Sequence, residues 1–284
     1  MNKKIIRVFP RKTKATPDDD KAFFDDPGLF TPDADEIHIS CVFTEDLPKA
    51  EMLARSWSRY GLPVKIGGPA TGEAGGDFEP GKYMKFGYVI TSRGCPNRCW
   101  FCSVWRREGT TIRELPITEG WNLQDDNILA TSTAHRKAVF AMLKQSADKY
   151  HQRIEFTGGL EAARLTREIT SELQELNPAQ LFFAYDTPDD KEPLFEAGKL
   201  LKEANFTFQN RKARAYVLIG YPADRLELAE QRLIDTVRAG FMPHAMLYKA
   251  DKFTPTQEWK RLQRQWARPA IISSIVKKLQ IIKD

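Results

Sequence analysis

Most of the chain alternates between short apolar runs and longer amphipathic segments. The amphipathic segments repeat apolar residues every three or four positions, which predicts helices. Successive apolar runs are about thirty residues apart, the size of a β-strand, helix, parallel β-strand unit. The pattern therefore predicts an α/β fold, with strands over 88–91, 122–130, 154–157, 181–185, 215–221 and 243–249 and helices over 134–150, 166–176, 192–204, 226–239 and 256–266.

The first 86 residues predict a separate, small α/β unit. Strands are expected over 5–9, 36–43 and 62–66, and a helix is expected between Asp46 and Gly61. Two segments rich in glycine, proline or charged residues predict loops, at 11–35 and at 67–87. The expected organisation is a small α/β N-terminal unit and linker over 1–86, a main domain over 87–250, and a basic, helical extension over 251–284.

Composition places few limits on the function. The hydrophobic content of 42% and charged content of 29% are ordinary for a globular protein. No run approaches the length of a membrane span and the first residues lack a signal peptide, so we expect a cytoplasmic protein without a membrane partner. The net charge of +5 permits an anionic partner such as nucleic acid without requiring one. Basic residues concentrate near the N-terminus, around 211–214 and near the C-terminus.

Three of the four cysteines lie within eight residues, directly after the strand predicted at 88–91: Cys95, Cys99 and Cys102. Thiolates bind soft metals such as zinc, copper(I) and the iron of iron–sulfur clusters. A structural zinc site is normally closed by four protein ligands, and no fourth ligand is near in sequence. A zinc site completed by a distant residue, a redox disulfide, or cysteines that only pack remain alternatives. Cys41 stands alone and is expected in the core, with Ile37 and Ile39.

With Phe101 directly before the last cysteine, this spacing resembles the signature of the radical S-adenosylmethionine (SAM) superfamily. The resemblance implies a [4Fe–4S] cluster. Three of its four irons would be held by Cys95, Cys99 and Cys102, and SAM would chelate the fourth iron. It also implies a partial (βα)6 barrel with the cysteine loop after its first strand, and an external electron donor such as flavodoxin or ferredoxin. One-electron cleavage of SAM would then yield methionine and a 5′-deoxyadenosyl radical that abstracts a substrate hydrogen.

Ligands of parallel barrels gather at the carboxyl ends of the strands, and the cofactor site is expected there. Many relatives place a segment that binds the SAM amino group after the second strand. Glu161 and Arg164 follow the third strand and are expected to bind a ribose, the SAM carboxylate or the substrate. No catalytic residue is assigned, and the expected cofactor-binding residues are Phe101, Asp125, Asp126, Asn127, Gly158, Gly159, Glu161 and Asp186.

Two strands near the C-terminus add less specific expectations. Gly220 alone matches a segment that contacts adenine in relatives. The last strand carries His244, Tyr248 and Lys249, which either face the cavity or complete the barrel.

Two segments, 113–127 and 157–161, are similar to a compact group of radical SAM proteins found in phages and microbes. Some phage members rebuild hypermodified thymine bases in DNA, for instance by rearranging glycyl-thymidine. This similarity implies an isomerase or mutase with DNA as substrate, in the host cytoplasm if a phage encodes the chain. The first 86 residues look like a truncated cobalamin-binding domain, but the Asp-x-His-x-x-Gly signature is absent, and His38 is expected to pack or to form a hydrogen bond. The alternatives are a cobalamin-type radical SAM methylase of a small molecule and a zinc-containing nucleic-acid-binding protein.

Overall fold

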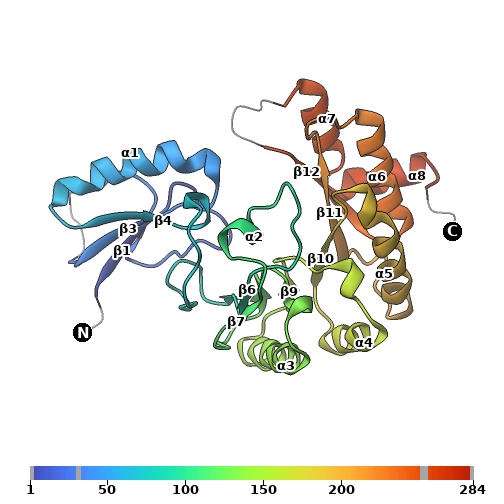
Figure 1. The fold of residues 1–284 in the computed structure, drawn as a ribbon, viewed down its shortest axis with the longest axis horizontal. Coiled ribbons are helices and arrows are strands. Elements are labelled where there is room, and N and C mark those ends of the chain that lie inside the picture. The colour runs from blue at the N-terminus through green and yellow to red at the C-terminus, as the bar shows by residue number, and fades with distance from the viewer. Residues whose placement is uncertain (1–2, 30–32, 250–254, 282–284) are drawn as a thin grey trace. The chain divides into compact units, whose positions relative to one another are not determined.

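The structure is a computed structural model that describes residues 3–29, 33–249 and 255–281. It confirms a mixed α/β fold with parallel sheets (Figure 1). The chain divides into two compact units, Met1–Gly120 and Trp121–Asp284. Each unit contains its own parallel strands and helices, so each is described by itself.

The first unit begins with a four-stranded parallel sheet in the order β2-β1-β3-β4. Ile37, Ile39 and Cys41 are fully buried in its core, which confirms the predicted core position of Cys41. The strand over Ala22–Phe23 was not expected, because it lies in a polar segment that predicted a loop. The bounds are β1 Ile5–Val8, β2 Ala22–Phe23, β3 Glu36–Ser40 and β4 Val64–Gly67.

One helix, α1 (Leu47–Trp57), packs against this sheet. Its buried residues Ala50, Leu53 and Trp57 recur at helical spacing, so the helix presents one apolar face to β3 and β4. The Trp57 indole also donates a hydrogen bond of 3.0 Å to the Asp25 carbonyl. Removing a fully buried tryptophan of this kind typically costs about 3–5 kcal/mol. Short 3₁₀ turns flank the helix at Thr44–Asp46 and Ser58–Tyr60, and a third follows β4 at Pro69–Thr71.

The first unit continues past the predicted boundary at residue 86. Arg93, Glu108 and Arg113 all form hydrogen bonds to Gly75 or Gly76, within the segment that predicted a linker. These contacts attach the segment between Arg93 and Arg113 to the glycine-rich segment of the first unit. The elements of this part are β5 Tyr88–Val89, β6 Ser92–Arg93, α2 Val104–Arg107 and β7 Arg113–Glu114.

The second unit repeats a strand followed by a helix, as the sequence predicts. Its parallel strands lie in the order β12-β11-β10-β9-β8. The strands are β8 Asn122–Leu123, β9 Glu155–Phe156, β10 Gln180–Ala184, β11 Ala213–Ile219 and β12 Met242–Leu247. The helices between them are α3 Thr133–Tyr150, α4 Arg167–Leu176, α5 Lys191–Glu203 and α6 Leu226–Arg238.

The two faces of this sheet differ. Along β11, Ala213, Ala215, Val217 and Ile219 are buried, whereas Arg214, Tyr216 and Leu218 between them are half-buried. Successive side chains of a strand point to opposite faces, so the buried set occupies one face, and α6 packs on β11 and β12. The half-buried set defines a second face with polar and aromatic side chains.

The strand predicted over 122–130 is much shorter, because β8 ends at Leu123. The N–H groups of Thr157 and Gly158 both donate to the Leu123 carbonyl, at 3.1 and 3.0 Å, and the regular ladder stops there. A 3₁₀ turn, Ile128–Ala130, takes the place of the rest of the strand, and further 3₁₀ turns lie at Ala162–Arg164 and Pro188–Asp190.

The C-terminal helices pack onto the second unit. The predicted helix over 256–266 is present as α7 Gln257–Gln265, and a further helix, α8 Pro269–Lys278, follows. Trp266 is fully buried, and its carbonyl accepts a 3.1 Å hydrogen bond from the Ala245 N–H of β12. Residues 251–254 and 282–284 of the predicted extension, and residue 250 before it, lie outside the described residues. Among the described residues, no helix is both long and apolar enough to cross a membrane.

Candidate functional site: the cysteine loop and the strand ends

The three clustered cysteines lie in the loop that joins β6 to β7. These two short strands pair antiparallel, with Arg93 opposite Arg113, and so close the base of the loop. Gly94 has a φ of +91°, and a Cβ at this position would lie 2.5 Å from the Thr111 carbonyl oxygen, so only glycine fits. The Cys95 N–H donates to the Gly109 carbonyl at 3.3 Å, which closes the loop a second time.

The backbone between the cysteines is fixed by side chains of α2. The Cys99 carbonyl accepts hydrogen bonds from the Cys102 N–H at 3.1 Å and from the Trp105 indole at 2.9 Å. Arg106 donates to the carbonyls of Cys102 and Trp100, at 2.9 and 3.1 Å. The carbonyls of Cys99, Trp100 and Cys102 are thus hydrogen-bonded within the loop. The soft metal-binding groups of the loop are its sulfur atoms.

Cys95 and Cys102 are half-buried and Cys99 is exposed. All four cysteines of the chain lie in described residues, and none forms a disulfide in this structure. Across the described ranges, no three His, Cys, Asp or Glu side chains are gathered as a metal site. The donor set fits an iron–sulfur cluster in kind and number, with three thiols on one held loop, although the sulfur atoms would have to converge to bind it. The expected aromatic, Phe101, packs edge-on against Trp100 with ring centroids 5.4 Å apart.

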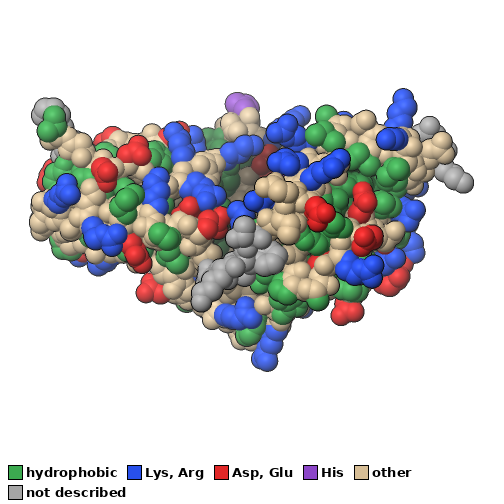
Figure 2. Space-filling model, turned by 90° about the horizontal axis from the view of Figure 1, so that it is seen from above, with side chains coloured by type: hydrophobic (Ala, Val, Ile, Leu, Met, Phe, Trp, Pro, Cys, Tyr) green, Lys and Arg blue, Asp and Glu red, His purple; other side chains and the backbone are tan. Residues whose placement is uncertain are grey.

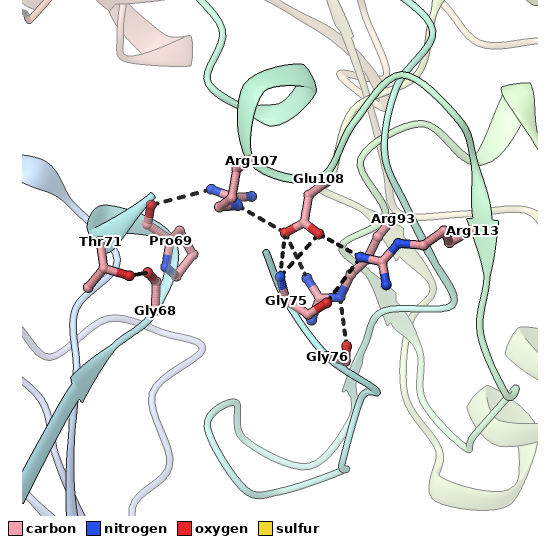
Figure 3. Close-up of polar contacts among 9 residues, drawn as sticks. All are labelled: Gly68, Pro69, Thr71, Gly75, Gly76, Arg93, Arg107, Glu108 and Arg113. Carbon is pink, nitrogen blue, oxygen red and sulfur yellow. Dashed lines mark hydrogen bonds and ion pairs between the residues drawn. The ribbon is translucent and has the colours of Figure 1, made fainter. Parts of the chain in front are cut away.

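A buried carboxylate that the sequence did not single out, Glu108, supports this loop (Figure 3). Its side chain is 1% exposed and pairs with Arg107 at 2.9 Å, Arg113 at 2.9 Å and Arg93 at 3.6 Å. The Gly75 N–H donates to both carboxylate oxygens, at 3.0 and 3.1 Å. Burial acts to raise the pKa of Glu108, but Arg107, the Gly75 N–H and Arg93 together hold it below its usual value.

The Glu108 cluster also fixes the glycine-rich segment. The Arg93 guanidinium lies where a Cβ of residue 75 would be, with its central carbon only 2.4 Å away. Arg93 also donates to the Gly76 carbonyl at 3.1 Å, and Arg113 donates to the Gly75 carbonyl at 3.0 Å. Figure 3 shows these groups converging on Gly75. The segment that predicted a flexible linker is therefore attached to the base of the cysteine loop.

In the second unit, the structure brings together three of the residues expected at the strand ends. The Asn127 amide and the Arg164 guanidinium both donate to the same Glu161 oxygen, at 2.7 and 2.6 Å. Asn127 is 3% exposed, and the Glu161 side chain is one-fifth exposed. The segments after β8 and β9 therefore meet in the structure, and the Glu161 carboxylate is already bound by two protein donors.

Asp125, Gly158 and Gly159 line a narrow depression that has no room for a water molecule in this structure. A Cβ at Gly158 would lie 2.4 Å from the Asp125 carbonyl oxygen, so this glycine allows the backbones after β8 and β9 to approach each other. Gly159 has a φ of +104° and open space around its Cα. Of the two glycines, only Gly159 leaves room for a ligand to approach the backbone.

Asp186 lies just after β10, and its side chain is engaged within the sheet. It accepts a 3.0 Å hydrogen bond from the Leu218 N–H of β11, and its own N–H donates to Asp190 at 2.9 Å. Burial, and then the neighbouring Asp190 carboxylate, raise the pKa of Asp186 to about 7. At neutral pH this carboxyl is therefore part protonated, so it can donate as well as accept a hydrogen bond.

The remaining expected positions are placed less specifically. Asp126 is half-buried, in the turn between β8 and the 3₁₀ helix. Gly220 has a φ of +73°, and a Cβ there would lie within 3.1 Å of the Leu247 and Trp259 side chains, so local packing accounts for this glycine. Tyr248 and Lys249 follow the end of β12.

A polar network on the second face of the sheet escaped the sequence analysis. The Asn122 amide donates to Glu155 at 2.8 Å, and the Gln124 amide donates to the Asn122 side-chain carbonyl at 2.9 Å. Thr157 completes the network with hydrogen bonds to Asn122 and Gln124. The signal was present in the sequence, because polar residues two positions apart on neighbouring parallel strands occupy the same face.

His38 forms hydrogen bonds, as expected. Its ring nitrogens contact the Tyr83 hydroxyl at 2.5 Å and the Glu36 carboxylate at 3.0 Å. Both nitrogens are therefore occupied by groups of the first unit.

No protein-family model matches this chain, and no curated protein matches it. The functional proposal therefore depends on the residues and their geometry.

Basic side chains of the N-terminal cluster are largely neutralised within the first unit. In the surface view of Figure 2, lysine and arginine side chains are interspersed with acidic ones. Among the described residues, four of these basic side chains pair with carboxylates: Lys3 with Glu36, Lys4 with Asp33, Arg7 with Asp19, and Arg11 with both Glu45 and Asp46. This pairing weakens the N-terminal cluster as a binding surface for a nucleic-acid backbone.

Proposed function

We propose that this chain is a radical SAM enzyme that abstracts a hydrogen atom from its substrate. The observation that carries the proposal is the cysteine loop, which has three thiols within eight residues on a backbone held by its own hydrogen bonds. The strand and helix repeat of the second unit supports it, because a partial barrel of parallel strands is the fold that the cysteine motif implies.

In this proposal Cys95, Cys99 and Cys102 would hold three irons of a [4Fe–4S] cluster. The cluster with SAM would supply the electron that cleaves SAM and the 5′-deoxyadenosyl radical that takes the substrate hydrogen. Glu161 and Asn127 offer oxygen acceptors for an ammonium group, and Asp186 offers a carboxyl for ribose hydroxyls.

We extend the proposal to the substrate, a modified thymidine of the glycyl-thymidine type in DNA, and to an isomerase-type outcome. The similarity of 113–127 and 157–161 to the phage group supports this extension, and the positive net charge is compatible with it. Flavodoxin or ferredoxin is the proposed electron donor. A cobalamin-dependent methylase is less well supported, because both ring nitrogens of His38 are already hydrogen-bonded.

The first test measures iron and sulfide in anaerobically reconstituted protein. We expect broad absorbance near 400 nm, a rough value for a cysteine-ligated cluster. Replacing Cys95, Cys99 or Cys102 by serine is expected to lower iron content at least several-fold. Cys41→Ser is the matched control, because Cys41 lies in the core of the first unit, between the four-stranded sheet and α1. This variant is expected to leave the iron content unchanged.

The second test adds SAM and dithionite to the reconstituted protein and measures 5′-deoxyadenosine. Product that disappears in the Cys99→Ser variant supports the proposal. Zinc without iron or sulfide in the purified protein would instead identify a zinc-containing nucleic-acid-binding protein. Nucleoside mass spectrometry after incubation with modified and unmodified DNA then tests the substrate, and copurified cobalamin would favour the methylase.

A further inference from the structure

The second face of the sheet in the Trp121–Asp284 unit carries a group of polar and aromatic side chains on β10, β11 and β12. The strands are in register, with Phe182 beside Arg214, and Tyr216 beside His244. Registered residues of parallel strands point to the same face, so these four side chains share one surface.

Arg214 is a half-buried cation without a carboxylate partner. Its guanidinium lies 5.6 Å from the centre of the Phe182 ring, and its Nε reaches the Arg211 carbonyl only at 3.4 Å. Within the described residues, its two terminal nitrogens form no ion pair or hydrogen bond. Burial lowers the pKa of Arg214, whereas the Glu155 carboxylate, which lies beyond ion-pair distance, acts to raise it. Half-buried charges are normally paired, so this one points to a partner that is not part of the chain.

Tyr216 and His244 present further polar groups on the same surface. The Tyr216 ring stacks on Phe182 at 4.6 Å between centroids and meets His244 edge-on at 5.8 Å. Neither the Tyr216 hydroxyl nor the His244 ring nitrogens have a hydrogen-bond partner among the described residues, and none of these atoms is sealed from solvent. Tyrosine and histidine in half-buried positions normally find such partners, so both groups are available to a ligand.

The exposed part of this surface is apolar. Leu218 is half-buried, and Met246, its neighbour in register, is 43% exposed. Both lie two residues further along the strands than Tyr216 and His244, toward the carboxyl ends, where parallel sheets bind ligands. A flat apolar ligand could therefore contact these side chains while its polar groups reach Arg214, Tyr216 and His244.

We propose that Arg214, Tyr216 and His244 bind a planar ring that carries a carboxylate or phosphate group. The Arg214 guanidinium binds the anionic oxygens, and the aromatic side chains pack against the ring. The Tyr216 hydroxyl and the His244 imidazole bind heteroatoms of the ring. The inference rests on the proposed function in one respect, because it assigns this ring as the substrate class of that enzyme.

Calorimetric titration of the full chain tests binding directly, with uridine 5′-monophosphate, uridine, benzoate and inorganic phosphate as probes. The ring with an anion is expected to bind, and uridine or phosphate alone is expected to bind at least about tenfold more weakly. Uridine 5′-monophosphate and benzoate separate the two sources of negative charge, because one carries a phosphate and the other a carboxylate. Arg214→Gln is expected to weaken binding of the preferred probe by about tenfold or more.

Three variants separate binding from folding. If Arg214 is kept for a ligand, Arg214→Gln leaves the melting temperature unchanged or raises it. Tyr216→Phe keeps the ring and is expected to weaken binding by about threefold to tenfold. Arg225→Gln, a change at an exposed arginine before α6, is expected to leave binding unchanged.

The inference would be overturned if neither uridine 5′-monophosphate nor benzoate bound. It would also be overturned if Arg214→Gln unfolded the chain and Tyr216→Phe bound the preferred probe as tightly as the unchanged protein does. Binding needs neither the cluster nor SAM. If the chain binds the probe through Arg214 but forms no 5′-deoxyadenosine, the radical SAM proposal alone is therefore contradicted.

Discussion

Glu108 of the first unit and Asp186 of the second are buried carboxyl groups with opposite surroundings. In the first unit, Glu108 is surrounded by three arginines, and its pKa is held below its usual value. In the second unit, Asp186 faces another carboxylate, and its pKa is raised to about 7, while Arg214 has no carboxylate within ion-pair distance among the described residues. The negative charge of Glu108 is thus more than compensated by its arginines, whereas Asp186 and Arg214 are poorly compensated.

This difference separates structural charge from charge that is available to a ligand. The Glu108 cluster joins the base of the cysteine loop to Gly75, so its arginines are occupied by the protein itself. The arginine on the sheet face has only a carbonyl at the limit of hydrogen bonding and an aromatic ring. Perturbed and poorly paired charges cluster at functional sites, which is the reason for testing Arg214 as a ligand-binding group.

The largest expected effect is that of breaking the Glu108 cluster. Glu108→Gln leaves Arg93, Arg107 and Arg113 close together without their shared negative charge, and it is expected to cost about 3–5 kcal/mol of the free energy of unfolding. Urea unfolding measures this, and iron content is expected to fall with it, because the base of the cysteine loop loosens.

The matched control is Glu79→Gln. Glu79 pairs with Lys82 at the surface, where its side chain is 65% exposed, so the change is expected to cost less than about 1 kcal/mol. Equal stability of the two variants would show that the Glu108 cluster is not structural, and the contrast between the units would fail.

A second prediction tests how firmly the second unit holds its strand ends. Gly158→Ala places a methyl group 2.4 Å from the Asp125 carbonyl oxygen, which forces the backbones after β8 and β9 apart. We expect a loss of about 1–3 kcal/mol in urea unfolding. Gly76→Ala serves as control, because a Cβ there meets open space. If Gly158→Ala left the free energy of unfolding unchanged, the backbones after β8 and β9 could move apart at little cost.

The third prediction concerns the pH dependence of stability. The pKa of Asp186 is about 7 in the folded chain against an ordinary value of 3.8, so the folded state holds its proton more tightly than the unfolded state. The free energy of unfolding should therefore fall as pH rises from about 4 to about 7, by up to about 1.4 kcal/mol per pH unit. Asp186→Asn, which cannot ionise, is expected to flatten this fall.

Thermal or urea unfolding between pH 4 and pH 8 checks this, with Asp189→Asn as a control in the same turn, because Asp189 is exposed. An unchanged slope in Asp186→Asn would place the proton on another group. Of Asp186 and Arg214, Arg214 would then be the one poorly compensated charge that supports the contrast.

Local pattern determined the elements. The apolar runs and the helical spacing of residues such as Leu53 and Trp57 predicted the longer helices and most strands to within a few residues, but not β6, β7 or α2. The short strand over Ala22–Phe23 and the early end of β8 were missed. Both depend on hydrogen bonds to distant parts of the chain, such as those that Thr157 and Gly158 make to the Leu123 carbonyl.

The sequence by itself determined the cysteine loop and the set of residues that follow the parallel strands, because both are written in local order and spacing. Only the tertiary structure decided which polar groups pair. Gly75 lies 33 residues before Glu108, and nothing local to either residue predicts that the buried carboxylate joins Gly75 to Arg113. The same holds for Arg214, because the absence of a charged partner becomes apparent only when neighbouring strands are in register. Long-range electrostatic pairing depends on the folded distances between charges, and those distances are set by the packing of the whole unit.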